Sequence, residues 1–127
     1  MTCPFCQLIA AADPRCIARF GGVISMQDLY PVSVGHTLVI PVEHLATYWG
    51  APAATQLALW AAVARVKAEL DFGYAPDGYN VGFNAGTAAG QTVQHLHIHV
   101  IPRYFGDVDD PRGGVRGCIP ARQRYEP

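Results

Sequence analysis

Polar and apolar residues alternate along residues 95–100, and every polar position there is a histidine. The histidines are His95, His97 and His99, and the apolar residues are Leu96, Ile98 and Val100. Side chains of an extended strand alternate between its two faces, so the pattern predicts three imidazoles on one face and aliphatic side chains on the other. Neighbouring histidines on that face would stand roughly 7 Å apart, which is two strand rises. We expect the strand to end at Pro102, because proline has no N–H to donate to a ladder.

The remaining pattern predicts four more strands and two helices. The strands cover residues 17–20, 23–27, 36–41 and 79–83, and the helices cover residues 7–12 and 53–70. Gly21-Gly22, between the first two strands, is a hairpin turn signal. The apolar stripe of the longer helix consists of Leu59, Val63, Val66 and Leu70. Phe72-Gly73 is expected to end this helix.

The chain of 127 residues is predicted to be a single domain, residues 1–127, with an irregular C-terminal segment, residues 104–127. This segment is rich in glycine, proline and arginine and should not form regular structure. It is either a loose surface extension or a segment folded near the mouth of a site. In the second case Arg112 or Arg116 would offer charge to a distal phosphate.

Composition narrows the classes of function. Half of the residues are hydrophobic and the formal net charge is −1, so the chain lacks the basic stripe of a nucleic-acid binder. No segment reaches the apolar length of a membrane span, and the N-terminus lacks the order of a signal peptide. We therefore expect a cytoplasmic protein that binds neither nucleic acid nor membrane. Its four cysteines should then be reduced and serve as ligands or in packing.

Two chemical interpretations fit the histidine strand: three ligands on one metal, or a nucleophile flanked by two helpers. The Cys3-Pro-Phe-Cys6 pair also has two usual roles, metal binding and redox exchange. The redox role needs a strand before the motif, and only two residues precede Cys3. Metal binding needs two further ligands from elsewhere in the chain.

The segment His95-Leu-His-Ile-His-Val-Ile101 resembles the signature of the histidine-triad (HIT) family, His-φ-His-φ-His-φ-φ with φ apolar. The flanking Gly-Gln-Thr-Val and Pro-Arg resemble the hydrolase branches of that family. A second hallmark is similar over Gly35-His-Thr-Leu-Val-Ile-Pro-x-x-His44. The resemblance covers most of the chain. We expect an α+β fold, a HIT-like antiparallel sheet of about five strands with one long and one short helix.

The resemblance implies a nucleotide site. His97 would attack the α-phosphorus and form a nucleotidyl-histidine, which water then hydrolyses. A backbone carbonyl on the same strand is expected to fix its tautomer. His99 and His36 would be cations that donate to phosphate oxygens or to the leaving group. Asp28, eight positions before His36, would contact ribose hydroxyls. The other residues expected to line the nucleotide and its phosphates are Asn84, Gly90, Gln91 and Thr92, together with His97 and His99.

The resemblance also implies a structural zinc ion, as in the bacterial branch of the family. Its ligands would be Cys3, Cys6, His44 and His95, which make a closed tetrahedral set of two thiolates and two imidazoles. The metal would tie the N-terminus to the central sheet. Cys16 and Cys118 are expected to serve in packing.

The expected function is that of a nucleotide-binding hydrolase that cleaves a nucleoside 5′-monophosphoryl group from a leaving group. Its substrate would be a dinucleoside polyphosphate, such as diadenosine tetraphosphate, or a nucleoside phosphoramidate. The alternatives are a nucleotidyl transferase or phosphorylase of the same superfamily, and a non-catalytic nucleotide- or zinc-binding dimer. The transferase branch has glutamine at the last triad position, so His99 argues against it. Relatives form homodimers, and Trp49, Trp60 and Val63 are the expected contact residues.

Overall fold

The computed structural model describes residues 2–126. Its helices and strands are α1 (Pro4–Ala10), β1 (Cys16–Phe20), β2 (Val23–Gln27), β3 (Thr37–Pro41), α2 (Ala53–Tyr74), β4 (Gly78–Gly82) and β5 (Ile98–Arg103). Short 3₁₀ turns are η1 (Tyr48–Gly50), η2 (Thr87–Ala89), η3 (Gly114–Cys118) and η4 (Pro120–Arg122). The predicted α+β class is confirmed. Within the described residues no helix is both long and apolar enough to cross a membrane.

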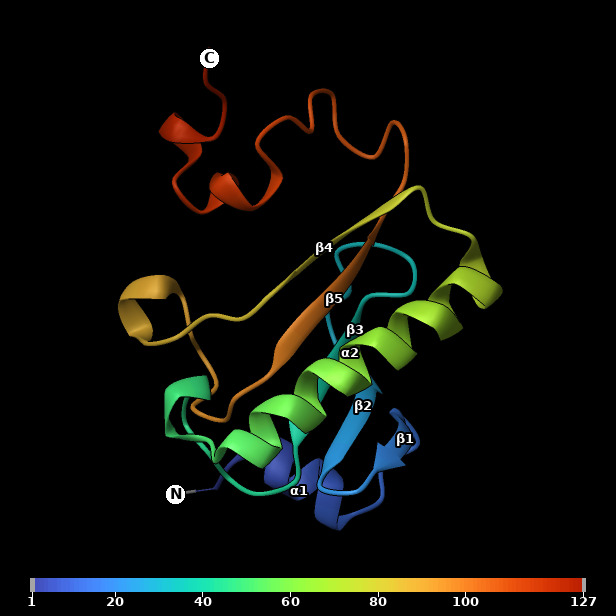
Figure 1. The fold of residues 1–127 in the computed structure, drawn as a ribbon, viewed down its shortest axis with the longest axis vertical. Helices are drawn as coiled ribbons and strands as arrows, with labels where there is room; N and C mark the ends of the chain where they lie inside the picture. Colours follow the sequence, from blue (N-terminus) through green and yellow to red (C-terminus); the bar gives the residue numbers. More distant parts are fainter. Residues whose placement is uncertain (1, 127) are drawn as a thin grey trace.

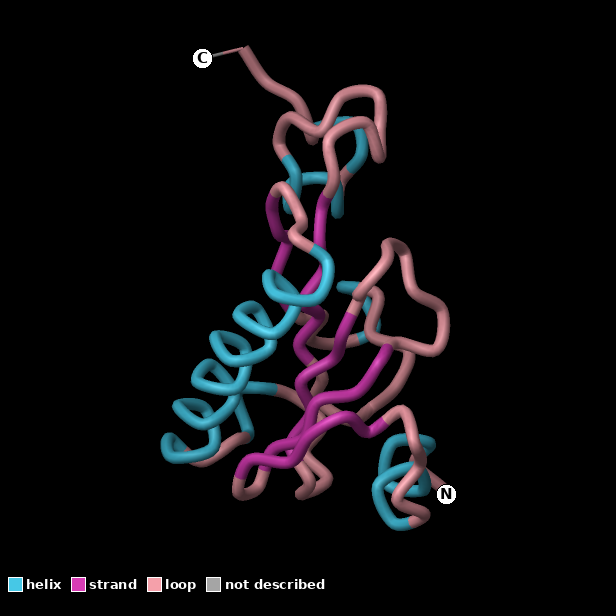
Figure 2. The backbone as a smooth tube through the Cα atoms, turned by 90° about the vertical axis from the view of Figure 1, so that its right-hand side faces the viewer, coloured by secondary structure: helices cyan, strands magenta, loops and turns pink. Residues whose placement is uncertain are grey.

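The five strands form one antiparallel sheet in the order β1-β2-β3-β5-β4. β5, the last strand in the chain, therefore lies between β3 and β4. The long helix α2 lies along one face of this sheet (Figure 1). The short helix α1 lies on the opposite side of the strands (Figure 2). This arrangement leaves the face that carries α1 only partly covered by helix.

Both faces of the sheet bury apolar side chains, because β2 and β3 are apolar at successive positions. The core under α2 includes Val23, Val39, Ile98 and Val100 of the sheet and Leu59, Ala62, Val66 and Leu70 of the helix. The core on the other face includes Phe5 of α1 and Ile24, Met26, Leu38 and Ile40 of the sheet. The predicted stripe holds for three of its four members, and Val63 is only partly buried at the edge of the first core. Burial of this apolar surface is the main term that stabilises the fold.

The short helix α1 begins earlier than the sequence predicts, at Pro4 rather than at residue 7. Cys3 is its N-cap, and its Sγ accepts a hydrogen bond from the Cys6 N–H at 3.4 Å. Proline suits the first helical turn because the N–H it lacks would have no partner there. The helix therefore positions both cysteines of the Cys-x-x-Cys pair.

The long helix α2 continues past its predicted end to Tyr74. Gly73 does not stop it. In the last turn, the Asp71 carboxylate accepts a hydrogen bond from the Tyr79 hydroxyl at 2.6 Å. The helix ends where Ala75 adopts a left-handed conformation, with φ of 47°.

The histidine strand starts later than predicted. β5 begins at Ile98, so His95 and His97 precede the strand rather than lie within it. Continued pairing with β3 would lead toward Pro41, which has no N–H. The Pro41 carbonyl instead accepts from the His95 ring, from Nε2 at 2.8 Å.

Pro102 does not end this strand, which runs on to Arg103. The Pro102 carbonyl accepts from Ser33 Oγ at 2.7 Å, so its backbone groups point away from β4. An N–H at this position would point toward β3, but the pairing of β5 with β3 already ends at Val100. The missing N–H therefore breaks no ladder bond, and the pairing with β4 continues.

Ser25 of β2 offers a test of the core. It is 1% exposed, and its Oγ has no hydrogen-bond partner among the described residues. An unsatisfied buried hydroxyl costs about 1–3 kcal/mol. Ser25→Ala is therefore expected to raise the free energy of unfolding by about 1 kcal/mol in urea denaturation. Ser33→Ala is the control, because it removes a satisfied hydroxyl and should lower stability. A loss of stability in Ser25→Ala would contradict the assignment.

Candidate active site

His97 has the orientation of a nitrogen nucleophile. Its Nδ1–H donates to the backbone carbonyl of His95 at 2.8 Å, so Nε2 keeps an unprotonated lone pair. The predicted tautomer lock by a backbone carbonyl is confirmed. The half-buried ring stands edge-on to Phe5, with centroids 5.0 Å apart, and lies 5.1 Å from the ring of His99. The Phe5 contact was not predicted, although Phe5 lies inside the Cys-x-x-Cys motif.

A tight loop between β2 and β3 positions Asp28 and His36. The Asp28 N–H donates to the carbonyl of His36 at 3.1 Å, and Asp28 Oδ1 accepts from the N–H of Tyr30 at 2.7 Å. Gly35 allows the turn into β3, with φ of 93°. A side chain at this position would be strained, and its Cβ would lie 3.1 Å from the Tyr74 ring.

His36 and His99 form a hydrogen-bonded series. The Val32 N–H donates to His36 Nδ1 at 3.2 Å, so in the neutral ring the proton is on Nε2. That Nε2–H donates to His99 Nδ1 at 2.9 Å. His99 accepts on Nδ1, and its own proton is therefore on Nε2. The series ends in an N–H donor on His99.

The Asp28 carboxylate lies beside these two rings. Its Oδ2 is 3.4 Å from His36 Nε2 and 3.9 Å from His99 Nδ1. Ligand atoms of the three residues lie within 4.8 Å of one another, as they would around a metal. In this arrangement, however, His36 Nε2 carries a proton and has no free lone pair. The group therefore fits a hydrogen-bonded relay better than a metal site. The ribose contact expected of Asp28 stays a prediction.

Burial keeps both relay histidines neutral. Burial lowers the pKa of His36, and Asp28 offsets this only in part. The pKa of His99 is lowered to about 4, chiefly by burial and then by His97 and His36. At pH 7 both rings are therefore neutral N–H donors. This differs from the predicted cations, because desolvation outweighs the attraction of one nearby carboxylate.

A cavity of about 970 Å³ opens beside His36 and His99, within the size range of small-molecule sites. β4, β5 and the loop around η2 supply much of its wall. These residues include Asn80, Gly82, Asn84, Ala88, Gly90 and Ile101. Of the predicted nucleotide-binding residues, Asn84, Gly90 and His99 line the cavity. Asp28, Gln91, Thr92 and His97 are not part of its lining.

Gln91 braces the loop instead of facing the cavity. Its side chain is buried, and Nε2 donates to the carbonyls of Ala46 at 2.8 Å and Val93 at 3.1 Å. Its Oε1 accepts from the Gly86 N–H at 2.8 Å. These bonds engage both ends of the amide. Gly90 has φ of 91° and presents backbone without a side chain to the cavity.

The C-terminal segment is folded at the mouth of this cavity, which agrees with one of the two sequence interpretations. Its lining residues are Gly114, Val115, Cys118 and Ile119. The arginines expected to reach a phosphate are engaged within the segment. Arg112 pairs with Asp110 at 2.9 Å, and Arg116 donates to the carbonyls of Arg122 and Gln123. Neither arginine lines the cavity.

A second cluster brings Cys3, Cys6, His44 and His95 together, with one ligand atom of each within 4.8 Å of the others. Cys3 Sγ lies 3.4 Å from His95 Nδ1. Cys6 Sγ lies 3.4 Å from His44 Nδ1 and 3.6 Å from His95 Nδ1. Tetrahedral zinc with ordinary Zn–S and Zn–N distances implies S···N separations of about 3.6 Å. The donor set therefore fits a closed four-coordinate metal ion.

His95 belongs to both groups. Its Nε2–H donates to Pro41, which leaves the Nδ1 lone pair directed at the sulfur atoms, as a metal ligand requires. Its carbonyl accepts the Nδ1–H of His97. The Cys₂His₂ cluster and the orientation of His97 thus both depend on one fully buried residue.

The fold and the site together define a small α+β protein with a histidine cluster beside a cavity and a Cys₂His₂ cluster linked to it through His95. The HIT domain family matches residues 11–106. An uncharacterised HIT-like protein of Methanocaldococcus jannaschii is 35% identical over 106 residues, which cover 83% of this chain and 81% of that protein. An AP-4-A phosphorylase of Mycobacterium tuberculosis is 34% identical over 84% of this chain and 56% of its own length.

A comparison with solved structures also finds members of the histidine triad family. A zinc-bound histidine triad family protein from Mycobacterium smegmatis has a TM-score of 0.77 at 36% identity, covering 84% of this chain and 78% of that one. The chain therefore belongs to the HIT family of nucleotide-processing proteins.

The titration of His99 tests the electrostatics of the site. Its pKa in the folded protein, about 4, lies below the ordinary 6.5, so the unfolded chain binds this proton first as pH falls. The stabilising effect of the neutral ring is thus present above pH 6.5 and is lost between pH 6.5 and 4. NMR of the imidazole protons should show a midpoint near 4, with His99→Gln to assign the signal. A midpoint near 6.5 would contradict the burial argument.

Proposed function

We propose that this chain is a nucleotide hydrolase that transfers a nucleoside 5′-monophosphoryl group first to His97 and then to water. One observation carries the proposal: the His97 Nδ1–H is bound to the carbonyl of His95, which leaves Nε2 as a free nucleophile beside the N–H donor of His99. Covalent catalysis of this kind divides one difficult displacement into two easier ones.

In the first step, His97 Nε2 forms a bond to the α-phosphorus, and the bond from phosphorus to the leaving group breaks. The Nε2–H of His99 donates a hydrogen bond to the leaving group, which takes up a proton from solvent as it departs. In the second step, water attacks phosphorus and returns a proton to solvent, the P–N bond to His97 breaks and the nucleoside monophosphate leaves. His36 holds His99 in the donating tautomer. Neutral donors placed in advance stabilise charge that develops in the transition state.

The nucleotide-binding residues of the proposal are Asp28, Asn84, Gly90, Gln91 and Thr92, with His97 and His99. Asn84 and Gly90 line the cavity, which supports their contact with phosphate. For Gln91 the contact is limited to its backbone, because its amide is engaged elsewhere. Asp28 would accept hydrogen bonds from ribose hydroxyls through the carboxylate lone pairs that do not face His36 and His99.

The candidate substrates are dinucleoside polyphosphates and nucleoside phosphoramidates. Similarity to an AP-4-A phosphorylase favours a second candidate reaction, in which inorganic phosphate replaces water in the second step. The products separate the two: hydrolysis yields a nucleoside monophosphate, and phosphorolysis yields a nucleoside diphosphate.

The proposal includes a zinc ion on Cys3, Cys6, His44 and His95 with a structural role. When bound, it supplies a crosslink between α1 and the start of the histidine segment. The fit of the donor distances and the similarity to a zinc-bound protein support it. A reducing, cytoplasmic location belongs to this proposal, because both thiols must stay reduced to bind metal.

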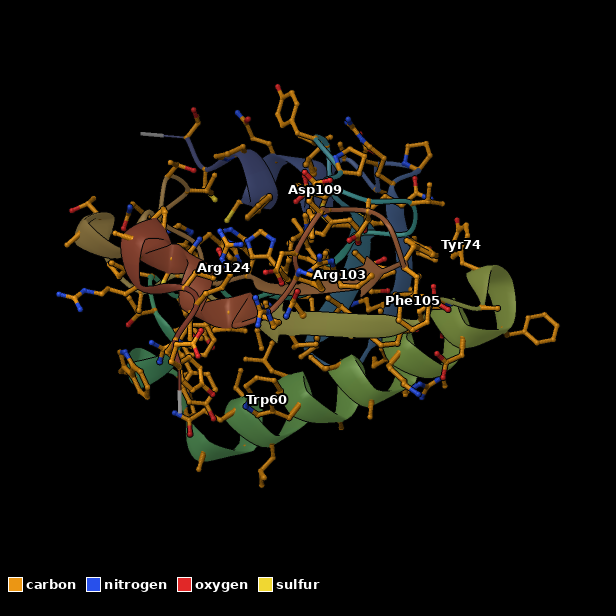
Figure 3. All side chains as sticks on the ribbon, turned by 90° about the horizontal axis from the view of Figure 1, so that it is seen from above. Trp60, Tyr74, Arg103, Phe105, Asp109 and Arg124 are labelled. Carbon is orange, nitrogen blue, oxygen red and sulfur yellow. The ribbon has the colours of Figure 1, made fainter. Side chains whose placement is uncertain are left out.

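A homodimer is also part of the proposal. Trp49 is 71% exposed and Trp60 is 40% exposed, and Trp60 projects from α2 (Figure 3). Together with Val63 at the edge of the core, these residues offer apolar surface that a second copy would cover.

His97 is tested by rapid mixing with diadenosine tetraphosphate labelled at the α-phosphate. The wild-type protein should trap label on the chain within one turnover, and His97→Ala should trap none and lose at least about 10³-fold in kcat, because the nucleophile is gone. Gln94→Ala, an exposed neighbour, is the control and should behave as wild type. Labelling of His97→Ala at the wild-type level would assign the nucleophile elsewhere.

The zinc proposal predicts one zinc ion per chain by elemental analysis. Cys6→Ser should lose this metal and melt at a lower temperature, because a thiolate ligand and the crosslink are removed. Cys118→Ser and His97→Ala should both retain it. Loss of metal in His97→Ala would instead support a three-histidine ligand set.

A further inference from the structure

The Cys-x-x-Cys motif contains an aromatic residue that contacts the nucleophile of the proposed reaction. Phe5 lies between Cys3 and Cys6 at the start of α1. Its ring centroid is 5.0 Å from that of His97 and 5.8 Å from that of His95. Both contacts are close to perpendicular, at 73° and 85°, which is an arrangement that aromatic rings favour. Phe5 is only 6% exposed. The surroundings of His97 therefore depend on the turn of α1 that carries the two cysteines.

Two neighbouring rings limit the tilt of the His97 imidazole. The hydrogen bond from Nδ1 to the His95 carbonyl fixes one ring atom, but a ring can still tilt about such a bond. Phe5 and His99 restrict this tilt, since their ring centroids lie 5.0 and 5.1 Å from that of His97. A misplacement of about 1 Å in a reacting group can cost about 10²-fold in rate. A displacement of Phe5 is therefore expected to lower kcat.

The Cys₂His₂ cluster is open to solvent on one side. Cys6 Sγ lies 3.4 Å from Nδ1 of His44, and His44 is exposed. On the other side Cys3 Sγ lies 3.4 Å from Nδ1 of His95, which is fully buried. Both cysteines are half-buried. Oxidation of cysteine requires a thiolate that solvent reaches, and it is favoured where a second cysteine stands next to the first. Cys6 meets both conditions.

The two sulfur atoms are close enough to be joined by a small movement. They lie within 4.8 Å of each other, and the Cys6 N–H already donates to Cys3 Sγ at 3.4 Å. A disulfide bond is about 2 Å long, so its formation has to contract this one turn of the chain. Phe5 belongs to the same turn and has to move with it. The disulfide also removes both thiolates, and a metal ion requires deprotonated sulfur ligands.

We propose that Cys3 and Cys6 form a redox switch that acts on His97, with a hydroperoxide such as hydrogen peroxide as the oxidant. The Cys6 thiolate attacks one peroxide oxygen, the O–O bond breaks, and a sulfenic acid and a hydroxide form. The Cys3 thiolate then attacks the Cys6 sulfur, the S–O bond breaks, and the disulfide and a second hydroxide form. Two protons from solvent convert both hydroxides to water, so two electrons pass from sulfur to peroxide. The disulfide releases the metal and draws Phe5 away from His97. The effect on kcat rests on the proposed function.

The test treats the zinc-loaded wild-type protein with hydrogen peroxide. Peptide mass spectrometry should find Cys3 linked to Cys6, and a colorimetric chelator should detect one released zinc ion per chain. The NMR signals of the His97 ring protons, assigned by their loss in His97→Ala, should shift because the Phe5 ring moves away. With adenosine 5′-phosphoramidate as substrate, kcat should fall at least about tenfold. Dithiothreitol together with zinc should reverse all four changes.

Three variants locate the effect. Cys6→Ser forms no disulfide, so peroxide should leave its kcat unchanged. Cys16→Ser is the matched control, because Cys16 is also half-buried but lies outside the cluster, and it should respond as the wild type does. Phe5→Leu keeps an apolar side chain without the aromatic ring. It should still form the disulfide and release zinc, but its kcat should already be about tenfold lower in the reduced state and should not fall further on oxidation.

The switch and the hydrolase fail in different ways. A Cys3–Cys6 disulfide that leaves the His97 signals and kcat unchanged would overturn the switch while the hydrolase stands, and so would the absence of this disulfide after treatment. A further tenfold fall of kcat in oxidised Phe5→Leu would overturn the role of Phe5. If the reduced wild type neither releases the monophosphate nor traps label on His97, the proposed function is overturned. The disulfide, the zinc release and the His97 signals then still decide whether the switch operates.

Discussion

His95 makes two hydrogen bonds on which the site depends, one through its ring and one through its backbone. The ring donates to Pro41 at the end of β3, and the carbonyl accepts from His97. The residue is fully buried, so each bond is formed without competition from water. The first bond directs the remaining ring nitrogen at Cys3 and Cys6, and the second leaves the far nitrogen of His97 unprotonated. A displacement of this one residue would affect the Cys₂His₂ cluster and the orientation of His97 together.

Burial, rather than charge, controls the chemistry of the site. Three imidazoles and one carboxylate lie close together, yet desolvation lowers the pKa of His36 and His99 enough to keep both neutral. The relay from the Val32 N–H through His36 to His99 then decides which nitrogen donates. A site of prearranged neutral donors does not have to reorganise when charge develops on a phosphoryl group.

The HIT domain match covers residues 11–106, and the segment that follows it also lines the cavity. The sheet, α2 and the loop with Gly90 lie within the HIT domain match, which also includes His36, His97 and His99. The segment after residue 106 adds a wall on the open side of the cavity. Its arginines bind Asp110 or carbonyls within the segment, and these bonds keep the segment folded without directing charge at the site.

The sequence by itself determined the features that depend on local alternation and spacing. The apolar residues between the histidines are buried as predicted, and the hairpin at Gly21-Gly22 forms. Side-chain direction repeats every second residue in an extended chain, so such a pattern can be read without coordinates. The cluster of Cys3, Cys6, His44 and His95 was expected from resemblance to a family, and not from local spacing.

Only the tertiary structure decided which groups meet across long separations. The late start of β5 depends on Pro41, far away in the chain, and the neutral state of His99 depends on how many segments cover it. The sequence also did not show that Arg112 pairs with Asp110, and the prediction had placed it near a phosphate. Hydrogen-bond partners and desolvation are set by packing between distant segments, and a one-dimensional pattern does not report them.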